Sequence, residues 1–305
     1  MLETQPRVLD VRAALQQGMS RLRERGVPSH TLAAELLLMH VLHQDRAWLY
    51  AHPEAVLDDA AATHYFELIH RRASGTPTQY LTGEQEFWGQ RFHVGPGVLI
   101  PRPETEHVVE VALERLRSAA GEVNRRGDGL RIVDVGTGSG CIAVALAREL
   151  PGAYVFATDI SNTALTVARS NASRHKAQVH FVQCSLLEAF LPWHTSPDEG
   201  SRFFDLIVSN PPYVARLEEG ALLREVREHE PAQALFGGAQ GQEIYTPLIQ
   251  QAGLVLAAGG VLVLELAYNA LAHVRPLLDP SLGWTQVTVT NDLAGIPRVI
   301  AAQKI

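Results

Sequence analysis

Hydrophobic residues in the second half of the chain recur with strand-like and helix-like spacing in turn. Short apolar runs that predict buried strands are separated by longer stretches in which apolar residues return every three or four positions, as on one face of a helix. The predicted strands span 130–135, 154–158, 179–183, 203–208 and 260–267, and the predicted helices span 141–150, 163–175, 246–257 and 268–278. This alternation is typical of an α/β protein with a doubly wound, mostly parallel sheet.

The end of the chain departs from this alternation. Strand-like patterns at 284–290 and 298–305 follow one another with only residues 291–297 between them. A link this short joins antiparallel neighbours, because a parallel crossover needs a dozen or more residues. We therefore expect the sheet to end in an antiparallel C-terminal strand pair.

The first 80 residues carry helical patterns only. Helices are expected at 8–25, 32–42, 45–50 and from about 59 to 72, with Ser29 as candidate N-cap of the second and either Asp58 or Asp59 as that of the fourth. We interpret residues 1–80 as a small N-terminal helical bundle domain that recognises the substrate, with a purely stabilising role as the alternative.

Residues 81–106 are interpreted as a hairpin and linker that lead into an α/β domain at 107–305. The turn of the hairpin is expected at Gly89-Gln90. Arg102 stands between two prolines, which favours an extended backbone. This segment is interpreted either as a stiff linker or as a wall of the active site. Farther along, the polar, glycine-bearing residues 121–129 predict a surface loop.

Composition narrows the functional classes. Of the 305 residues, 46% are hydrophobic and 19% charged, and the net charge of −7 disfavours an extended nucleic-acid-binding surface. Two cysteines give no disulfide framework, and the thirteen histidines lack the spacing of metal ligands. Because the chain shows neither a membrane-spanning apolar stretch nor a basic leader, we expect no membrane association and a cytoplasmic location.

A glycine-rich loop, Gly136-Thr137-Gly138-Ser139-Gly140, follows the strand that is expected to end at Val135. Glycines let the backbone turn sharply and approach a ligand closely. A dinucleotide-binding loop needs the spacing G-x-G-x-x-G, which this loop lacks. Asp134 before the loop suits a ligand that carries an amine, and Asp159 at the end of the next strand can accept hydrogen bonds from ribose hydroxyls.

A second site is predicted at Asn210-Pro211-Pro212-Tyr213, directly after the strand at 203–208. Consecutive prolines end a strand, and the carboxyl end of a parallel strand is where open α/β sheets bind ligands. Asn210 Oδ1 and the Pro211 carbonyl can each accept an N–H of a planar NH2 group, while the Tyr213 ring can cover its plane. The alternative is an ordinary turn, since Asn-Pro pairs commonly begin turns.

Together these motifs resemble those of S-adenosylmethionine-dependent methyltransferases that act on amino groups. More narrowly, the chain is similar to the HemK/PrmC family, the release factor glutamine methyltransferases. The similarity extends over nearly the whole chain and includes residues 99–106, Glu230-Pro231, Ala234-Leu235, Gly237-Gly238 and 294–299. It implies a class I, Rossmann-like methyltransferase fold.

The resemblance also implies roles for individual residues. S-adenosyl-L-methionine would be bound by the loop from Gly136 to Gly140, by Asp159 at its ribose and by Leu186 at its adenine. Where family members commonly carry an acid near Leu186, this chain has Cys184 and Ser185.

By the same resemblance, Asn210, Pro211, Pro212 and Tyr213 would bind the acceptor glutamine. Asn210, Pro211 and Tyr213 would be the catalytic residues, and Asn210 would also contact the cofactor. No obvious general base stands in this motif, so the expected strategy is to place the amide nitrogen and to stabilise the charge that develops on it.

The expected function is methylation of the side-chain nitrogen of the glutamine in the Gly-Gly-Gln motif of bacterial class 1 peptide chain release factors, which act in translation termination. The partner is therefore a release factor, with no membrane and no direct nucleic-acid contact. Three alternatives stay open: a glutamine of a ribosomal protein, an exocyclic amine of a flipped nucleic-acid base, and a binding module without turnover.

Overall fold

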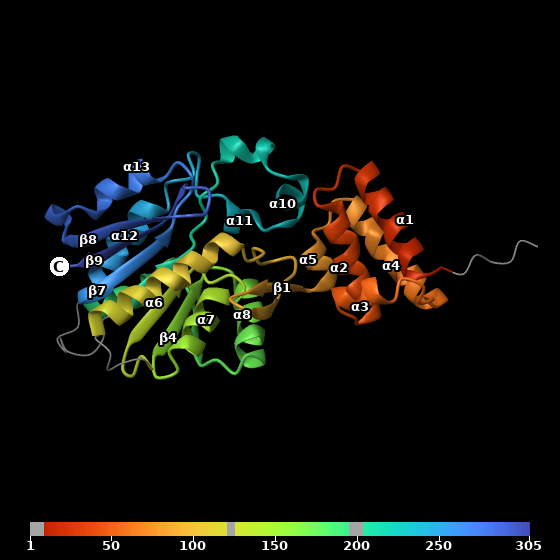
Figure 1. The fold of residues 1–305 in the computed structure, drawn as a ribbon. Coiled ribbons are helices and arrows are strands. Elements are labelled where there is room, and N and C mark those ends of the chain that lie inside the picture. The colour runs from red at the N-terminus through yellow and green to blue at the C-terminus, as the bar shows by residue number, and fades with distance from the viewer. Residues whose placement is uncertain (1–8, 121–125, 195–203) are drawn as a thin grey trace, which may run out of the picture. The chain divides into compact units, whose positions relative to one another are not determined.

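The computed structural model describes residues 9–120, 126–194 and 204–305, and the chain divides into two compact units (Figure 1). Unit 1 comprises Met1–Glu84 and Leu223–His229, and unit 2 comprises Gln85–Leu222 and Glu230–Ile305. Part of the loop expected at 121–129 lies outside the described residues.

Unit 1 is a bundle of short helices around an apolar core that includes Leu37 and Tyr65. Three of its helices begin at an aspartate, Asp10, Asp45 or Asp58, whose carboxylate accepts a backbone N–H three residues later and so caps the helix. The described helices of the unit are α1 (Val11–Glu24), α2 (His30–Leu42), α3 (Arg46–Ala51), α4 (Asp59–Ala73), α5 (Thr78–Thr82) and α10 (Arg224–His229).

The start of α2 differs from the expectation that Ser29 caps it. Ser29 has a left-handed backbone with φ +49°, and its side chain makes no capping hydrogen bond in the described helix. An N-cap residue is normally extended, which lets its side-chain oxygen reach the free N–H groups of the first turn. The left-handed turn at Ser29 replaces that arrangement, and the helix begins at His30.

The helix α10 belongs to unit 1 although it lies far along the sequence. The Arg72 side chain, which is 6% exposed, forms an ion pair with Glu225. Gly75 passes so close to Arg224 that an added Cβ would lie 3.2 Å from the guanidinium Nε. The ion pair with Glu225 compensates the charge of this buried arginine.

Unit 2 contains a seven-stranded sheet in the described part of the chain. Its strand order is β5-β4-β3-β6-β7-β9-β8, with neighbours parallel from β5 to β7 and β9 antiparallel to both of its neighbours. This confirms the predicted fold class. The strands are β3 (Arg131–Val135), β4 (Tyr154–Asp159), β5 (Val179–Gln183), β6 (Phe204–Ser209), β7 (Leu256–Glu265), β8 (Trp284–Asn291) and β9 (Pro297–Lys304).

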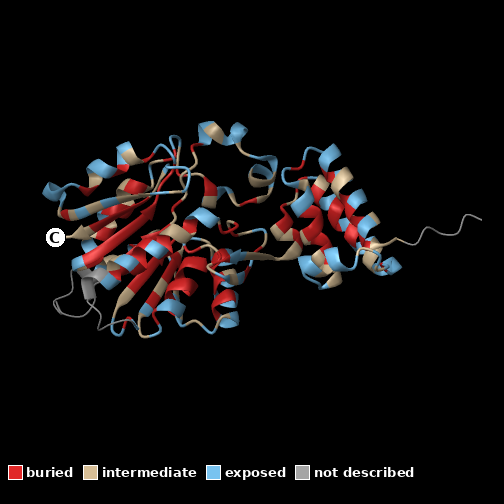
Figure 2. Ribbon diagram, viewed as in Figure 1, coloured by how far each residue is buried: buried red, intermediate tan, exposed pale blue. Residues whose placement is uncertain are grey.

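Helices cover both faces of the sheet, and the buried residues follow the strands and the inner sides of the helices (Figures 1 and 2). One face packs against α6 (Glu106–Ala120), α7 (Cys141–Glu149) and the end of α8 (Asn162–Arg174). The other face packs against α12 (Tyr245–Val255) and α13 (Leu271–Val274). Successive residues of β3, Ile132 and Val133, enter opposite cores, as the pleat of a strand requires.

Short elements connect these layers. A hairpin of β1 (Glu84–Phe87) and β2 (Gln90–His93) precedes the sheet, and its turn lies at Trp88-Gly89 instead of the expected Gly89-Gln90. Both turn residues have positive φ, which matches the two-residue turn favoured by twisted hairpins. The remaining short helices are η1 (Pro103–Thr105), η3 (Glu188–Phe190), α9 (Leu191–His194), η4 (Arg216–Ala221), α11 (Ala232–Leu235), η5 (Arg275–Leu278) and η6 (Pro280–Leu282).

Two boundaries near the C-terminus were predicted wrongly. The strand β7 begins at Leu256, four residues before the predicted start, so α12 ends at Val255. The single helix expected at 268–278 is instead α13 followed by the 3₁₀ turn η5. Pro276 lies in that turn and has no N–H to donate to an α-helical ladder, which explains the change of helix type.

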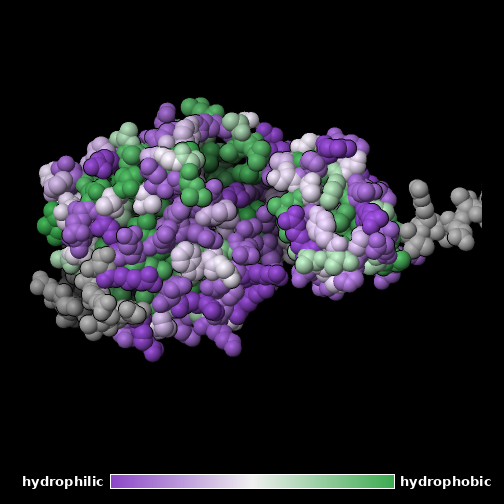
Figure 3. All heavy atoms as spheres, viewed as in Figure 1, coloured by the Kyte–Doolittle hydropathy of each residue, from purple (hydrophilic) through white to green (hydrophobic). Residues whose placement is uncertain are grey.

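The surface drawn in Figure 3 is mainly hydrophilic, with scattered hydrophobic residues. In the ranges that the structure describes, no helix is both long enough and apolar enough to cross a membrane.

Candidate active site

The site predicted from the sequence lies where the strand order of the sheet reverses, between β3 and β6. These strands are parallel neighbours, with Val135 opposite Ser209. The Ser209 hydroxyl donates to the Val135 carbonyl at 2.7 Å and ties the two strand ends together. Open α/β sheets bind ligands at such a reversal, beyond the carboxyl ends of the strands. The glycine-rich loop and the Asn210 motif therefore leave the sheet side by side.

The glycine-rich loop turns sharply over the end of β4. The N–H groups of Gly136 and Thr137 both donate to the Thr158 carbonyl at 2.9 Å. Gly136 and Gly138 have φ of +72° and +55°, and a Cβ added to either would meet nothing described within 4 Å. These two glycines thus adopt the positive-φ backbone that the turn needs, and they leave open space in front of the loop. Both features allow a ligand to approach the loop backbone closely.

Asp134 lies beneath this loop and is fully buried. Its Oδ2 accepts hydrogen bonds from the Thr137 hydroxyl at 2.6 Å and from the Ala143 N–H at 3.1 Å. Its Oδ1 has no hydrogen-bond partner in the described part of the chain. Burial raises the pKa of Asp134 to about 7. A cationic or N–H-bearing ligand could satisfy this buried carboxylate oxygen.

Asp159 ends β4 and presents an oriented carboxylate at the same edge of the sheet. Its Oδ2 accepts the Gly138 N–H at 2.9 Å, and its Oδ1 accepts the Ser161 N–H at 2.8 Å. Burial raises the pKa of Asp159, and these backbone donors oppose the rise. Each oxygen retains a lone pair, so the carboxylate can accept two further hydrogen bonds from a diol.

Leu186 lies in the turn after β5 and is held to the same edge of the sheet. Its carbonyl accepts the Thr158 hydroxyl at 2.9 Å, and the next N–H, that of Leu187, donates to Gln251 Oε1. The φ of Leu186 is +48°, an uncommon conformation for a large side chain. The structure thus brings Leu186, Asp159 and the glycine-rich loop to one edge.

Asn210 is held by a residue that the sequence reasoning did not single out. Its Nδ2 donates to the Thr105 hydroxyl oxygen at 3.0 Å. Its Oδ1, the atom predicted to accept a substrate N–H, has no hydrogen bond from the residues that the structure describes. Thr105 is buried at the end of η1, so the proline-rich segment 99–106 lies directly against the Asn210 motif.

The same segment is anchored from its other side by Glu230, which is buried. Glu230 Oε1 forms an ion pair with Arg102 at 2.6 Å, and Oε2 accepts the Ile100 N–H at 3.2 Å. Arg102 has the extended backbone that its flanking prolines predict. Glu230 therefore holds the segment that carries Thr105 in place, because it binds both the Arg102 side chain and the Ile100 backbone. This role explains the glutamate of the Glu230-Pro231 motif.

Tyr213 is oriented by a second residue that the sequence reasoning missed, Glu265. The Tyr213 hydroxyl donates to Glu265 Oε1 at 3.0 Å. Glu265 ends β7 and is 1% exposed, and burial raises its pKa to about 6. The sequence signal for Glu265 was a single carboxylate directly after the apolar run 261–264. Charged residues are rarely buried unless they are paired, so a carboxylate at the end of a buried strand indicates a specific partner.

The turn that carries Tyr213 is packed against two glycines of the segment 235–241. A Cβ on Gly237 would lie 2.3 Å from the Pro212 carbonyl oxygen, and one on Gly241 would lie 2.4 Å from the Tyr213 carbonyl oxygen. The Val214 N–H also donates to the Leu235 carbonyl at 2.8 Å. Only residues without a Cβ permit this approach, which explains Gly237 of the motif.

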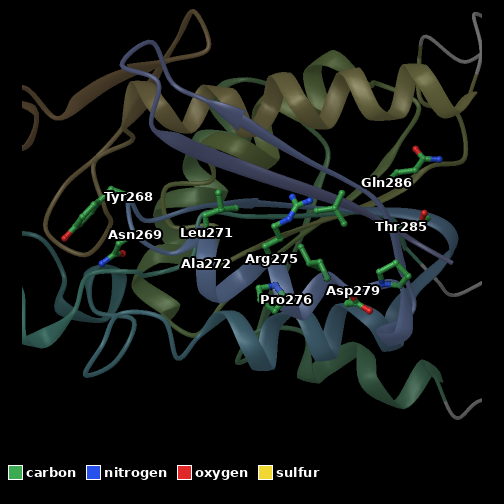
Figure 4. Close-up of a pocket in the computed structure, with 12 residues that line it drawn as sticks. Tyr268, Asn269, Leu271, Ala272, Arg275, Pro276, Asp279, Thr285 and Gln286 are labelled. Carbon is green, nitrogen blue, oxygen red and sulfur yellow. The ribbon is translucent and has the colours of Figure 1, made fainter.

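A pocket of about 990 Å³ lies elsewhere, between the connection after β7 and the edge strand β8 (Figure 4). The labelled side chains run from Tyr268 and Asn269 at one end to Thr285 and Gln286 at the other, with Arg275 between them. None of the site residues predicted from the sequence lines this pocket.

The class of the protein, a methyltransferase, is shown by a family-model match and by its relatives. Residues 121–233 match the family model "Methyltransferase small domain", and residues 13–83 match "PrmC N-terminal domain". The chain is 43% identical to the release factor glutamine methyltransferase of Koribacter versatilis (strain Ellin345), over 97% of this chain and 99% of that protein. With the protein of the same name from Geobacter sulfurreducens (strain ATCC 51573 / DSM 12127 / PCA), it shares 38% identity over 98% of each chain. The chain belongs to the release factor glutamine methyltransferase family.

A solved structure agrees on the fold. The catalytic domain of hMettl16, determined in complex with the MAT2A 3′UTR hairpin 6, superposes with a TM-score of 0.53. The match covers 78% of this chain and 81% of that chain at 18% identity. At that identity the likeness concerns the architecture alone, and the RNA in that complex says nothing of the substrate of this chain.

Proposed function

We propose that the protein transfers a methyl group from S-adenosyl-L-methionine to the side-chain amide nitrogen of the glutamine in the Gly-Gly-Gln motif of peptide chain release factors. The observation that carries the proposal is the orientation of Asn210, whose Nδ2 is bound by Thr105 and whose Oδ1 is left for another donor. Near-full-length similarity to proteins named release factor glutamine methyltransferase supports this substrate.

The residues present fit the methyl donor. Asp134 Oδ1 would take its ammonium group, Gly136 and Gly138 would leave room for its methionine end, Asp159 would take its ribose hydroxyls, and Leu186 would contact its adenine. The orphaned, buried oxygen of Asp134 and the open space at the two glycines support this assignment. When bound, the cofactor supplies an electrophilic methyl group.

Asn210 and Pro211 contribute placement and charge stabilisation. An amide nitrogen is a poor nucleophile because its lone pair is shared with the carbonyl. Two acceptors, Asn210 Oδ1 and the Pro211 carbonyl, would hold the N–H groups of the substrate and orient the nitrogen. Both interactions strengthen as the nitrogen becomes positive, so they favour the transition state over the ground state.

The assignment of Asp134 predicts how cofactor binding depends on pH. In the free protein the pKa of Asp134 is raised to about 7 by burial, and a bound ammonium group would lower it. Binding then prefers the ionised form of Asp134, so affinity should level off just above pH 7. Below pH 7 it should fall by up to about tenfold per pH unit.

Isothermal titration calorimetry of S-adenosyl-L-methionine binding between pH 5.5 and 8.5 measures this dependence. In Asp134→Asn, which cannot ionise, the acidic fall should disappear and affinity should be weaker at pH 8. An unchanged affinity of the native protein across this range would contradict the role of Asp134.

We further propose that the helical unit recognises the protein substrate. Removing residues 1–84 should then raise KM for the release factor by about tenfold or more, the equivalent of ~1.4 kcal/mol, with cofactor affinity kept. Because the deletion leaves Glu225 without Arg72, the shortened protein should be compared with and without Glu225→Gln. Equal KM values for the full chain and a folded shortened chain would leave the unit a stabilising role only.

Methyl transfer from radiolabelled cofactor to separated cellular protein, ribosomes and RNA tests the substrate class. The proposal predicts label in purified release factor and in no RNA fraction. Label in RNA would favour a nucleobase amine as the substrate, and label in a ribosomal protein would favour the nearest competing substrate. No label in any fraction would favour a binding module without turnover.

A cytoplasmic location without membrane association belongs to this proposal. The free thiols of Cys141 and Cys184 agree with that location, because disulfides are rare in the cytoplasm.

A further inference from the structure

The helix α8 carries a polar residue, Asn171, on its buried face. The other buried positions of this face are apolar, and they include Ala164, Leu165 and Ala168. Asn171 itself is 0% exposed. Asparagine is mostly found at the surface of proteins, so a fully buried one at a core position of a helix indicates a specific set of hydrogen bonds.

The side-chain amide of Asn171 makes three hydrogen bonds. Its Oδ1 accepts the backbone N–H of His93 at 2.7 Å, and its Nδ2 donates to the His93 carbonyl at 3.0 Å. Nδ2 also donates to the Ser139 carbonyl at 2.8 Å. Among side chains of this length, only that of asparagine provides one acceptor and two N–H donors. The opposite orientation of the amide would set its oxygen against two carbonyl oxygens, so these partners fix the orientation.

Ser139 lies in the glycine-rich loop, and its carbonyl is where Asn171 holds that loop. The first half of the loop is bound to β4: two of its N–H groups donate to the Thr158 carbonyl, and the Gly138 N–H donates to Asp159. These bonds end before Ser139. The Asn171 amide therefore supports the second half of the loop from the side of α8.

The same helix contacts the loop directly and positions Asp159. A Cβ added to Gly140 would lie 3.0 Å from the Ala168 Cβ, so the helix and the loop are in contact at this glycine. At the start of the helix, the Ser161 N–H donates to Asp159 Oδ1. One helix thus sets the position of the loop that is proposed to bind the methionine end of the cofactor and of the carboxylate that is proposed to bind its ribose.

We propose that Asn171 is a positioning residue for the cofactor, because it fixes the Ser139 carbonyl and thereby the conformation of the glycine-rich loop. This inference rests on the proposed function, in which that loop binds S-adenosyl-L-methionine. A loop that is already held in its binding conformation loses less conformational freedom when the ligand binds, which raises the affinity. Without the Asn171 amide, the cofactor itself has to order the loop, and its Kd rises.

Asn171→Asp and Asn171→Ala should each weaken the binding of S-adenosyl-L-methionine by about 10- to 100-fold. Aspartate has the shape of asparagine, but its second oxygen is an acceptor that faces the Ser139 and His93 carbonyls. Alanine removes the amide altogether. Calorimetry well below the unfolding temperature of each variant measures Kd, and thermal unfolding separately measures the loss of stability that both substitutions cause.

The matched control is His175→Phe. His175 follows the last residue of α8, and its Nε2 bonds to the Arg91 carbonyl of the hairpin at 2.8 Å. Phenylalanine keeps a ring beside Phe92 and loses this bond, which connects the helix end to the same hairpin but not to the glycine-rich loop. His175→Phe should lower the unfolding temperature and leave the cofactor Kd within about twofold.

Hydrogen exchange of the cofactor-free protein gives a readout that depends on neither turnover nor cofactor binding. The Gly140 N–H donates to the Thr137 carbonyl at 2.8 Å within the loop. In the native protein it should be protected from exchange before any cofactor is added. Its exchange should be several-fold faster in Asn171→Asp and unchanged in His175→Phe. The native measurement decides the point even if the Asn171 variants do not fold.

The outcomes distinguish this inference from the function on which it rests. A native Kd in the Asn171 variants, an equal loss of affinity in His175→Phe, or an unprotected Gly140 N–H in the native cofactor-free protein would overturn the positioning role and leave the methyltransferase function intact. A native protein that binds no S-adenosyl-L-methionine, with the Gly140 N–H protected and faster exchange in Asn171→Asp alone, would overturn the proposed function and leave the support of the loop by Asn171 intact.

Discussion

Replacing Asn210 by alanine is expected to lower the rate of glutamine methylation by about 100- to 1,000-fold, as loss of one preorganised polar group does in other active sites. Alanine removes the acceptor Oδ1 and leaves the Thr105 hydroxyl without its Nδ2 donor. Asn210 is only half-buried, so the fold should persist with a small loss of stability. Single-turnover rates at saturating cofactor, together with thermal unfolding, measure the two effects separately.

Asn210→Asp is the matched comparison, because aspartate keeps an acceptor at the position of Oδ1. It should retain more activity than alanine, although its second oxygen faces Thr105 in place of the Nδ2 donor. If both variants are folded and equally inactive, the argument that an acceptor at residue 210 drives the reaction is wrong.

Asp159→Ala should weaken binding of S-adenosyl-L-methionine by roughly 30- to 1,000-fold, or ~2–4 kcal/mol, because two hydrogen bonds to a charged acceptor are lost. The substitution also frees the Gly138 N–H that Asp159 holds, so the glycine-rich loop loses a support. Calorimetry with the cofactor and with its demethylated product measures the change directly.

The control for Asp159 is Asp279→Ala. Asp279 accepts the N–H of Ser281 two residues later, just as Asp159 accepts that of Ser161, but it lies in an exposed turn after η5. Its replacement should leave the cofactor Kd within about twofold. Undiminished affinity in Asp159→Ala would refute the assignment of Asp159 to the ribose.

The sheet could be predicted from the sequence because its strands are short and buried, with helices between them. Each apolar run from 130 to 208 became a strand of the parallel sheet, and the short connection 291–297 gave the antiparallel pair β8 and β9. The position of the site could also be predicted, because the glycine-rich loop and the consecutive prolines each end a strand at the edge of the sheet where ligands bind. Residues near 256 and 276 were misjudged because apolar periodicity alone does not mark where a helix changes to a strand or to a 3₁₀ turn.

What the sequence left open depends on contacts between distant residues. Thr105 and Asn210 are 105 positions apart, and Tyr213 and Glu265 are 52 apart, so no local pattern joins them. Likewise, nothing in the local sequence assigns α10 to unit 1, whose contacts with it include the ion pair between Arg72 and Glu225. The roles of the predicted residues toward cofactor and substrate remain predictions.

The most direct test of the account is to locate the transferred methyl group. Purified release factor should be incubated with the enzyme and isotopically labelled cofactor, and the product fragmented by mass spectrometry. The account predicts a single methyl group on the side-chain nitrogen of the glutamine in the Gly-Gly-Gln loop, none after Gln→Ala at that position, and none with the Asn210→Ala enzyme on the same time scale. A methyl group on any other residue, or label that persists in the Gln→Ala substrate, would contradict it.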